Sequence, residues 1–456
     1  MQNTKEDPQL QRGLEERHIT LMSLGAAIGV GLFLGSASAI KLAGPGIIVS
    51  YALGGFIIYL VMRALGEMAI KNPVAGSFSR YARDYIGPFA GYITGWNYWF
   101  LWIVTCMAEI TAVGIYMQFW FPDTAQWAWA LAALLIMTTV NFLSVKAYGE
   151  LEYWFALIKI ITIVLMIIVG FGMIFFGLGN GGDAIGFANL FEHGGFLPNG
   201  VSGIIMSFQM VMFAYLGIEM LGVTAGEVKN PEKNLKRAIN TVFYRIMIFY
   251  VLSLTVILSI YPWDAITGQN SPFVLTFEKI GIPGAAGIVQ FVVLTAALSS
   301  CNSGIFSTAR MLFNLAQQGE SPKQFQRTTK SGVPGTAIIV SAVVLLFGVY
   351  LNYIVSDKVF GYVTSVATFG ALWTWGTILI TQLKSRKVMS RQELNKLQFK
   401  MPLFPLTSYL ALAFLLFVTV VLAFSPVTRV ALIVGPLWLG FLTIVYYATG
   451  LHKRNQ

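Results

Sequence analysis

Long apolar runs recur along the whole chain, and they constrain its fold more than any other feature. Of the 456 residues, 56% are hydrophobic and 11% are charged, whereas soluble domains carry about 25% charged residues. A helix needs about 20 apolar residues to cross the hydrocarbon core of a bilayer. The chain is therefore predicted to be an all-α polytopic membrane protein without a separate soluble domain.

Twelve segments meet this length requirement, and mostly short polar stretches separate them. The predicted spans are 19–41, 46–70, 86–118, 127–145, 152–178, 201–227, 238–261, 281–313, 335–355, 359–383, 403–424 and 428–450. The expected organisation is a cytoplasmic tail (1–18), a ten-helix core (19–383), a cytoplasmic loop (384–402), two further spans (403–450) and a second cytoplasmic tail (451–456).

The net charge of +10 has a distribution typical of membrane proteins. Basic residues concentrate in the loops on one side, as the positive-inside bias requires, and only Lys41, Lys279, Lys358 and Arg429 fall on the other. This asymmetry predicts a bacterial inner-membrane protein with both termini in the cytoplasm. It also explains the charge without a nucleic-acid partner.

No constellation of catalytic or metal-binding residues stands out. Cys106 and Cys301 lie in apolar segments, and the three histidines are scattered outside the spans, so neither a disulfide framework nor a metal site is expected. P-loop, HExxH and GxSxG motifs are absent from the sequence. We expect no enzyme activity and no cofactor.

Two of the predicted spans are rich in glycine. The first contains GAAIGVGLF (25–33), and the sixth contains FAYLGIE (213–219) followed by Gly222 and Gly226. A broken helix is tolerated in lipid only where its freed backbone groups line a buried cavity. Such a pair at corresponding positions of two five-helix halves indicates an inverted-repeat transporter. The alternative is that the small residues only permit close helix packing.

Several sequence stretches resemble the amino acid transporter family of the APC superfamily. The resemblance covers nearly the whole chain and rests on RGLEERHI (12–19), GAAIGVGLFLGSA (25–37), AGPGIIVSYALGG (43–55), MRALGEM (62–68), GWNYW (95–99), LGIEMLGVTAGEVKNPEK (216–233), SPFVLTF (271–277) and LTAALSSCNSGIFSTARML (294–312). It implies the LeuT-type fold, with inverted five-helix repeats at about 19–178 and 201–383 plus two C-terminal helices. It also implies amino acid uptake by proton symport.

The resemblance indicates a substrate less firmly than it indicates the family. QMVMFAY (209–215) and SIYPW (259–263) are most similar to proline-specific members, so proline is the first expectation. Histidine and aromatic amino acid permeases are close relatives and remain alternatives, as does exchange without net proton movement. A non-transporting membrane sensor is a remote alternative, because no sizeable output domain is present.

The two breaks provide the predicted substrate site. Helix N-termini carry about +0.5 elementary charge and unpaired N–H groups, which suit a carboxylate, while carbonyls freed in the sixth span suit an ammonium or imino group. This arrangement favours a neutral amino acid. By the resemblance, Phe213 is an aromatic gate, although most phenylalanines here are lipid-facing or core residues. The predicted binding residues are Ala27, Ile28, Gly29, Val30, Gly31, Phe213, Ala214 and Gly217.

Ionisable residues inside the spans are the candidates for proton coupling, because intramembrane charges are costly. Lys159 is the first candidate; by the resemblance it occupies the position of a sodium ion in sodium-coupled members. The alternative is a lysine that snorkels to the boundary. Glu219 either exchanges protons or clamps the sixth span. Possible supporting residues are Glu109, Ser299, Asn302 and Ser303.

Overall fold

All the regular secondary structure of the described residues is helical. The computed structural model describes residues 25, 28–74, 76–223, 231–266, 271–279 and 284–454. The first half contains α2 (Val30–Phe33), α3 (Gly35–Ala43), η1 (Gly44–Gly46), α4 (Ile47–Lys71), α5 (Ser77–Tyr85), α6 (Pro88–Met117), α7 (Gln126–Leu143) and α8 (Val145–Phe176).

The second half repeats this alternation of long helices and short connections. Its elements are α9 (Gly200–Ala214), α10 (Met220–Val223), α11 (Pro231–Ile246), the π-helical η4 (Met247–Leu252), α12 (Ser253–Ile260), α13 (Pro272–Lys279), α14 (Ala285–Gln317), α15 (Gly335–Ile354) and α16 (Ser356–Val388). The C-terminal part adds α17 (Arg391–Lys396), α18 (Leu406–Val421), α19 (Pro426–Arg429), α20 (Ala431–Ala448) and α21 (Leu451–Arg454).

Within these described residues, ten helices are long and apolar enough to cross a membrane. The expected sixth span is divided, since α9 ends at Ala214 and α10 begins at Met220. The described part of the first span is short, and α3 continues through η1 into α4, so that Gly35–Lys71 forms one long helical stretch. A polytopic all-helical protein is confirmed, while the total of twelve spans stays a prediction.

The boundaries of α8 correct one expected span. The sequence suggested a start near 152, but α8 begins at Val145, where the Ser144 side chain caps it by accepting a hydrogen bond from Ala147 N at 3.0 Å. Gly177, in the left-handed region with φ of 65°, ends it. The longer helix places Lys159 near its middle.

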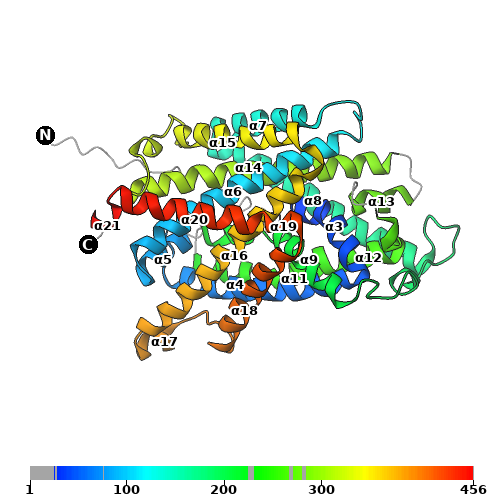
Figure 1. Cartoon of the computed structure of the whole chain (residues 1–456). Helices are drawn as coiled ribbons and strands as arrows, with labels where there is room; N and C mark the ends of the chain where they lie inside the picture. Colours follow the sequence, from blue (N-terminus) through cyan, green and yellow to red (C-terminus); the bar gives the residue numbers. More distant parts are fainter. Residues whose placement is uncertain are drawn as a thin grey trace.

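Helices at the same position in the two halves pack against each other. α3 contacts α9, α4 contacts α11, α6 contacts α14 and α7 contacts α15. Figure 1 shows most long helices running roughly along one direction, with α5 and α21 at one end and α12 and α13 at the other. A two-fold relation between two repeats would produce such pairs, and the repeat boundaries themselves stay a prediction.

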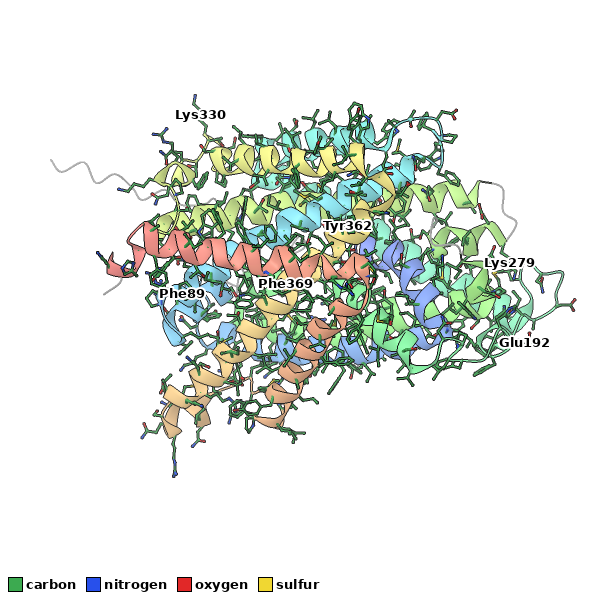
Figure 2. The ribbon with its side chains drawn as sticks, viewed as in Figure 1. Phe89, Glu192, Lys279, Lys330, Tyr362 and Phe369 are labelled. Carbon is green, nitrogen blue, oxygen red and sulfur yellow. The ribbon has the colours of Figure 1, made fainter. Side chains whose placement is uncertain are left out.

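Charged side chains lie at both ends of this bundle. Lys330 lies at one end, whereas Glu192 and Lys279 lie at the opposite end (Figure 2). The positive-inside count likewise puts Lys279 and Lys330 on opposite sides of the membrane. Which end faces the cytoplasm stays a prediction of that count.

A partly buried ion pair connects α5 to the segment that follows α14, at the Lys330 end. Arg83 of α5 donates to Glu320 Oε1 at 2.7 Å, just beyond the end of α14. Trp96 Nε1 donates to the Glu320 carbonyl at 3.2 Å. Burial raises the pKa of Glu320 to about 7, and the charge of Arg83 only partly opposes this rise.

The raised pKa predicts a pH-dependent stability. A carboxyl group whose pKa is higher in the folded state than in the unfolded state contributes to stability. The contribution is complete when the pH is below the pKa of the unfolded state, and it disappears as the pH rises through about 7, the pKa of the folded state. In thermal unfolding experiments in detergent, the free energy of unfolding of the unmodified protein should fall by up to about 3 kcal/mol between pH 5 and pH 8, relative to that of Glu320→Gln. Parallel curves for the two proteins would contradict the prediction.

Candidate functional site

The first predicted break includes Ile28 and Gly29. Ile28 is not helical, Gly29 has extended backbone with φ of −124° and ψ of −162°, and α2 begins at Val30. A second interruption at Leu34 separates α2 from α3. Ala27 lies outside the described residues. The break therefore falls where the glycine pattern placed it.

The second break follows α9. Residues 215–219 form turns between α9 and α10. Gly217 has φ of 97°, a backbone conformation that residues other than glycine rarely adopt. Glu219 Oε2 accepts hydrogen bonds from Gly217 N at 3.2 Å and from Trp375 Nε1 at 3.4 Å. Glu219 thus holds the interrupted backbone, which is one of the two roles expected for it.

The carbonyl groups at this break are partly occupied. Phe213 O accepts from Leu216 N at 3.1 Å, and Ala214 O accepts from the Tyr250 hydroxyl at 2.9 Å. Gly217 O accepts from Met220 N at 3.1 Å. Because a carbonyl oxygen has two lone pairs, each can accept one further hydrogen bond.

The two breaks touch each other and enclose a small cavity. A Cβ atom on Gly31 would lie 2.5 Å from Ala214 Cα, so the two backbones are in close contact. The cavity beside this contact is lined by Gly29, Gly31, Trp102, Thr105, Glu109, Phe213, Ala214, Leu216 and Ser300. Of the residues predicted to bind substrate, Gly29, Gly31, Phe213 and Ala214 line it, whereas Ile28, Val30 and Gly217 do not.

Glu109 of α6 reaches this cavity from the side. Its carboxyl group faces the Ser300 hydroxyl and the backbone N–H of Val30, and its side chain is 2% exposed. The charge of Lys159 also acts on it. Glu109, which the sequence suggested only as a supporting residue, thus contacts Val30 at the first break and lies within reach of the charge of Lys159.

Lys159 is buried, at 1% exposure, and its amine is held by two acceptors. Nζ donates to the Gly25 carbonyl at 3.0 Å and to Ser299 Oγ at 2.9 Å. Gly25 packs directly on α8, since a Cβ there would lie 2.6 Å from Ala156 Cβ. The amine therefore points into the bundle and does not snorkel to a boundary.

Glu152 is a neighbour of this amine that the sequence analysis missed. Ser299 donates to its Oε1 at 2.6 Å, and it lies two helical turns before Lys159 on the same face of α8. The seven-residue spacing of an acid and a lysine in an apolar helix is the pattern that would have revealed it. Asn302 and Ser303 face its carboxyl group.

The described residues contain no group of three or more His, Cys, Asp or Glu side chains that could hold a metal ion. The side chains brought together here are acids, hydroxyls, amides and one amine. Side chains of these kinds are suited to binding a small polar molecule. The fold and the site together define a membrane transporter.

Comparisons with known proteins identify the family. The model of the family described as "Amino acid permease" matches residues 18–456. The chain is 68% identical over 451 residues to the uncharacterized amino acid permease YtnA of Bacillus subtilis, covering 99% of this chain and 97% of the relative. The chain belongs to the amino acid permease family of the APC superfamily, whose members are transporters rather than enzymes.

Two further relatives differ in their named substrates. The probable threonine/serine transporter YbxG of Bacillus subtilis is 49% identical, with 98% of this chain and 97% of the relative covered. The aromatic amino acid transport protein AroP of Escherichia coli O6:H1 is 44% identical, with 98% and 97% covered. Family membership implies the LeuT-type fold and an amino acid substrate, and it leaves the particular amino acid unsettled.

The contact between the breaks predicts a severe effect of adding one methyl group. Gly31→Ala would overlap the Ala214 backbone, and overpacking of this kind costs about 1–3 kcal/mol. We expect amino acid uptake by liposomes containing the purified variant to fall at least tenfold. Gly376→Ala is the matched control, because a Cβ there meets nothing within 4 Å. Equal activity of both variants would contradict the close contact.

Proposed function

We propose that this permease imports a small neutral L-amino acid, with proline as the first expected substrate, by proton symport across the bacterial inner membrane. Alternating access occurs around the two broken helices. The observation that carries the proposal is the position of Glu109, which lines the substrate cavity together with Gly29, faces the Val30 N–H and is acted on by the charge of Lys159.

Backbone groups bind the two ends of the amino acid. The N–H groups at the start of α2 donate to the carboxylate, and the carbonyls of Phe213 and Ala214 accept a hydrogen bond from the ammonium or imino group. Among the described residues that line the cavity, none is a lysine or arginine. Recognition of a neutral zwitterion therefore needs no cation from a side chain.

Substrate binding and the proton meet at Glu109. The Val30 N–H faces the Glu109 carboxyl group and belongs to the start of α2, whose N–H groups bind the substrate carboxylate in this proposal, so the two acids compete for it. Two nearby negative charges favour protonation of Glu109 or of Lys159. Proton binding and substrate binding then reinforce each other, which is the thermodynamic requirement for symport.

Threonine and serine are the second candidate substrates. Thr105 and Ser300 place hydroxyl groups in the cavity lining, and the relative YbxG is named a threonine/serine transporter. Small lining residues, Gly29, Gly31 and Ala214, and the rings of Trp102 and Phe213 restrict the space. A larger histidine or aromatic substrate would need these two rings to move.

A single transport experiment tests mechanism and substrate together. Purified protein in liposomes takes up radiolabelled proline with and without an inward proton gradient, in the presence of excess unlabelled threonine, serine, histidine or phenylalanine. Gradient-stimulated uptake blocked only by proline supports symport of proline, and blockade by threonine and serine transfers the assignment to them. Uptake that occurs only into preloaded vesicles would instead indicate an exchanger.

Replacement of Lys159 tests the coupling directly. Lys159→Met removes the titratable amine and should abolish stimulation by the proton gradient, while the variant still exchanges labelled for unlabelled substrate. Lys358→Met, at an exposed position, is the matched control. Undiminished stimulation in Lys159→Met would refute proton coupling through this residue.

A further inference from the structure

A second line of polar groups connects Lys159 to Glu152 through Ser299. Ser299 Oγ accepts a hydrogen bond from Lys159 Nζ at 2.9 Å and donates one to Glu152 Oε1 at 2.6 Å. Lys159, Ser299 and Glu152 are each at most 1% exposed. The hydroxyl is therefore already oriented as a proton relay from the amine to the carboxylate.

The other oxygen of Glu152 continues the line. Within the described structure, Oε2 has no hydrogen-bond partner, and both Asn302 and Ser303 face the carboxyl group. Ser303 Oγ lies 3.2 Å from the Tyr148 hydroxyl. Asn141 donates to Asn302 Oδ1 at 2.8 Å and fixes the neighbouring amide.

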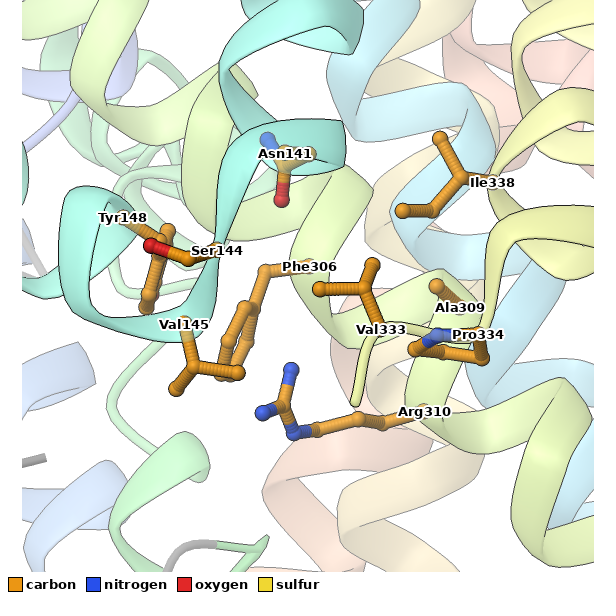
Figure 3. Close-up of a pocket in the computed structure, with 10 residues that line it drawn as sticks. All are labelled: Asn141, Ser144, Val145, Tyr148, Phe306, Ala309, Arg310, Val333, Pro334 and Ile338. Atoms are coloured by element: carbon orange, nitrogen blue, oxygen red, sulfur yellow. The ribbon is translucent and has the colours of Figure 1, made fainter. Parts of the chain in front are cut away.

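This line ends in a second cavity, separate from the substrate cavity. Asn141 and Tyr148 line it together with Ser144, Val145, Phe306, Ala309, Arg310, Val333, Pro334 and Ile338 (Figure 3). The cavity lies where α7 ends and α8 begins. Two of its lining residues, Val333 and Pro334, follow Lys330 closely in the sequence, and Lys330 marks the end of the bundle that the charge count predicts to be cytoplasmic. The guanidinium of Arg310 lies 3.2 Å from the centre of the Phe306 ring.

We infer that Ser299, Glu152, Ser303 and Tyr148 carry the proton from Lys159 to this cavity and thus to the cytoplasm. The inference rests on the proposed function, since it requires Lys159 to be the coupling group. Glu109 and Glu152 then have different roles: Glu109 couples Lys159 to the substrate, and Glu152 accepts the proton that Lys159 releases towards the cytoplasm.

The transfer consists of balanced proton shifts. The Lys159 ammonium gives one proton to Ser299 Oγ while the Ser299 hydroxyl gives its own to Glu152 Oε1, leaving a neutral amine and a neutral carboxylic acid. The carboxyl group then rotates so that its protonated oxygen faces Ser303 and gives that proton to Ser303 Oγ, while the Ser303 hydroxyl passes its own proton through Tyr148 to water in the cavity. Loss of that proton restores the Glu152 carboxylate, whose charge favours the next protonation of Lys159.

The test compares Glu152→Gln with Glu150→Gln in liposomes. The glutamine keeps an oxygen that accepts from Ser299 but cannot hold the transferred proton. We expect the ratio of gradient-driven uptake to substrate counterflow to fall at least tenfold in Glu152→Gln, and to recover partly in Glu152→Asp. Glu150, two residues earlier on α8 and outside this line, is the matched control and should keep the native ratio.

Three outcomes separate the path from the coupling itself. If Lys159→Met loses gradient stimulation and Glu152→Gln keeps it, the path is wrong and coupling through Lys159 stands. If Lys159→Met keeps its stimulation, the proposed coupling is wrong. If Glu152→Gln loses counterflow as well, the comparison of Ser299→Ala with Ser299→Thr decides. Undiminished gradient-driven uptake in Ser299→Ala overturns the relay. Uptake that is lost in Ser299→Ala and retained in Ser299→Thr supports it.

Discussion

The burial of one amine organises the centre of this bundle. An uncompensated charge in the membrane interior costs about 2.5 kcal/mol or more, so Lys159 needs acceptors that an intact apolar helix cannot provide. One of them is the Gly25 carbonyl, which also accepts a hydrogen bond from Ile28 N at 3.0 Å at the interruption of the first span. The same interruption exposes N–H groups at the start of α2. A single break thus serves the amine on one side and the substrate cavity on the other.

Close backbone contacts keep these groups in place. Gly25 lies against Ala156 of α8, and Gly31 lies against Ala214 of α9, so the first segment is held between two other helices through glycine. α6 and α14, which pack along each other, supply Glu109 and Ser299, and Ser299 accepts a hydrogen bond from the amine. The site therefore combines interrupted segments with a frame of long continuous helices.

The sequence predicted the glycine breaks and Lys159 because both violate the ordinary chemistry of a membrane span. It underestimated Glu109 and missed Glu152, since their importance depends on which side chains the other helices bring to them. Ser300 and Trp102 were missed for the same reason: one serine or tryptophan in an apolar helix does not reveal which helix it faces. The start of α8 was placed too late because its first turn includes polar residues beyond the apolar run.

Tyr250 sits within the π-helical turn η4 and donates to the Ala214 carbonyl at the second break. A π-turn contains one residue more than the α-helical path would need, and such turns occur frequently at functional sites. Deleting one residue from this turn would restore a regular helix and rotate α11 by about 100° relative to α12. The extra residue thus sets the angular phase between these two helices, and a homologue that lost it would have to satisfy the Ala214 carbonyl from another direction.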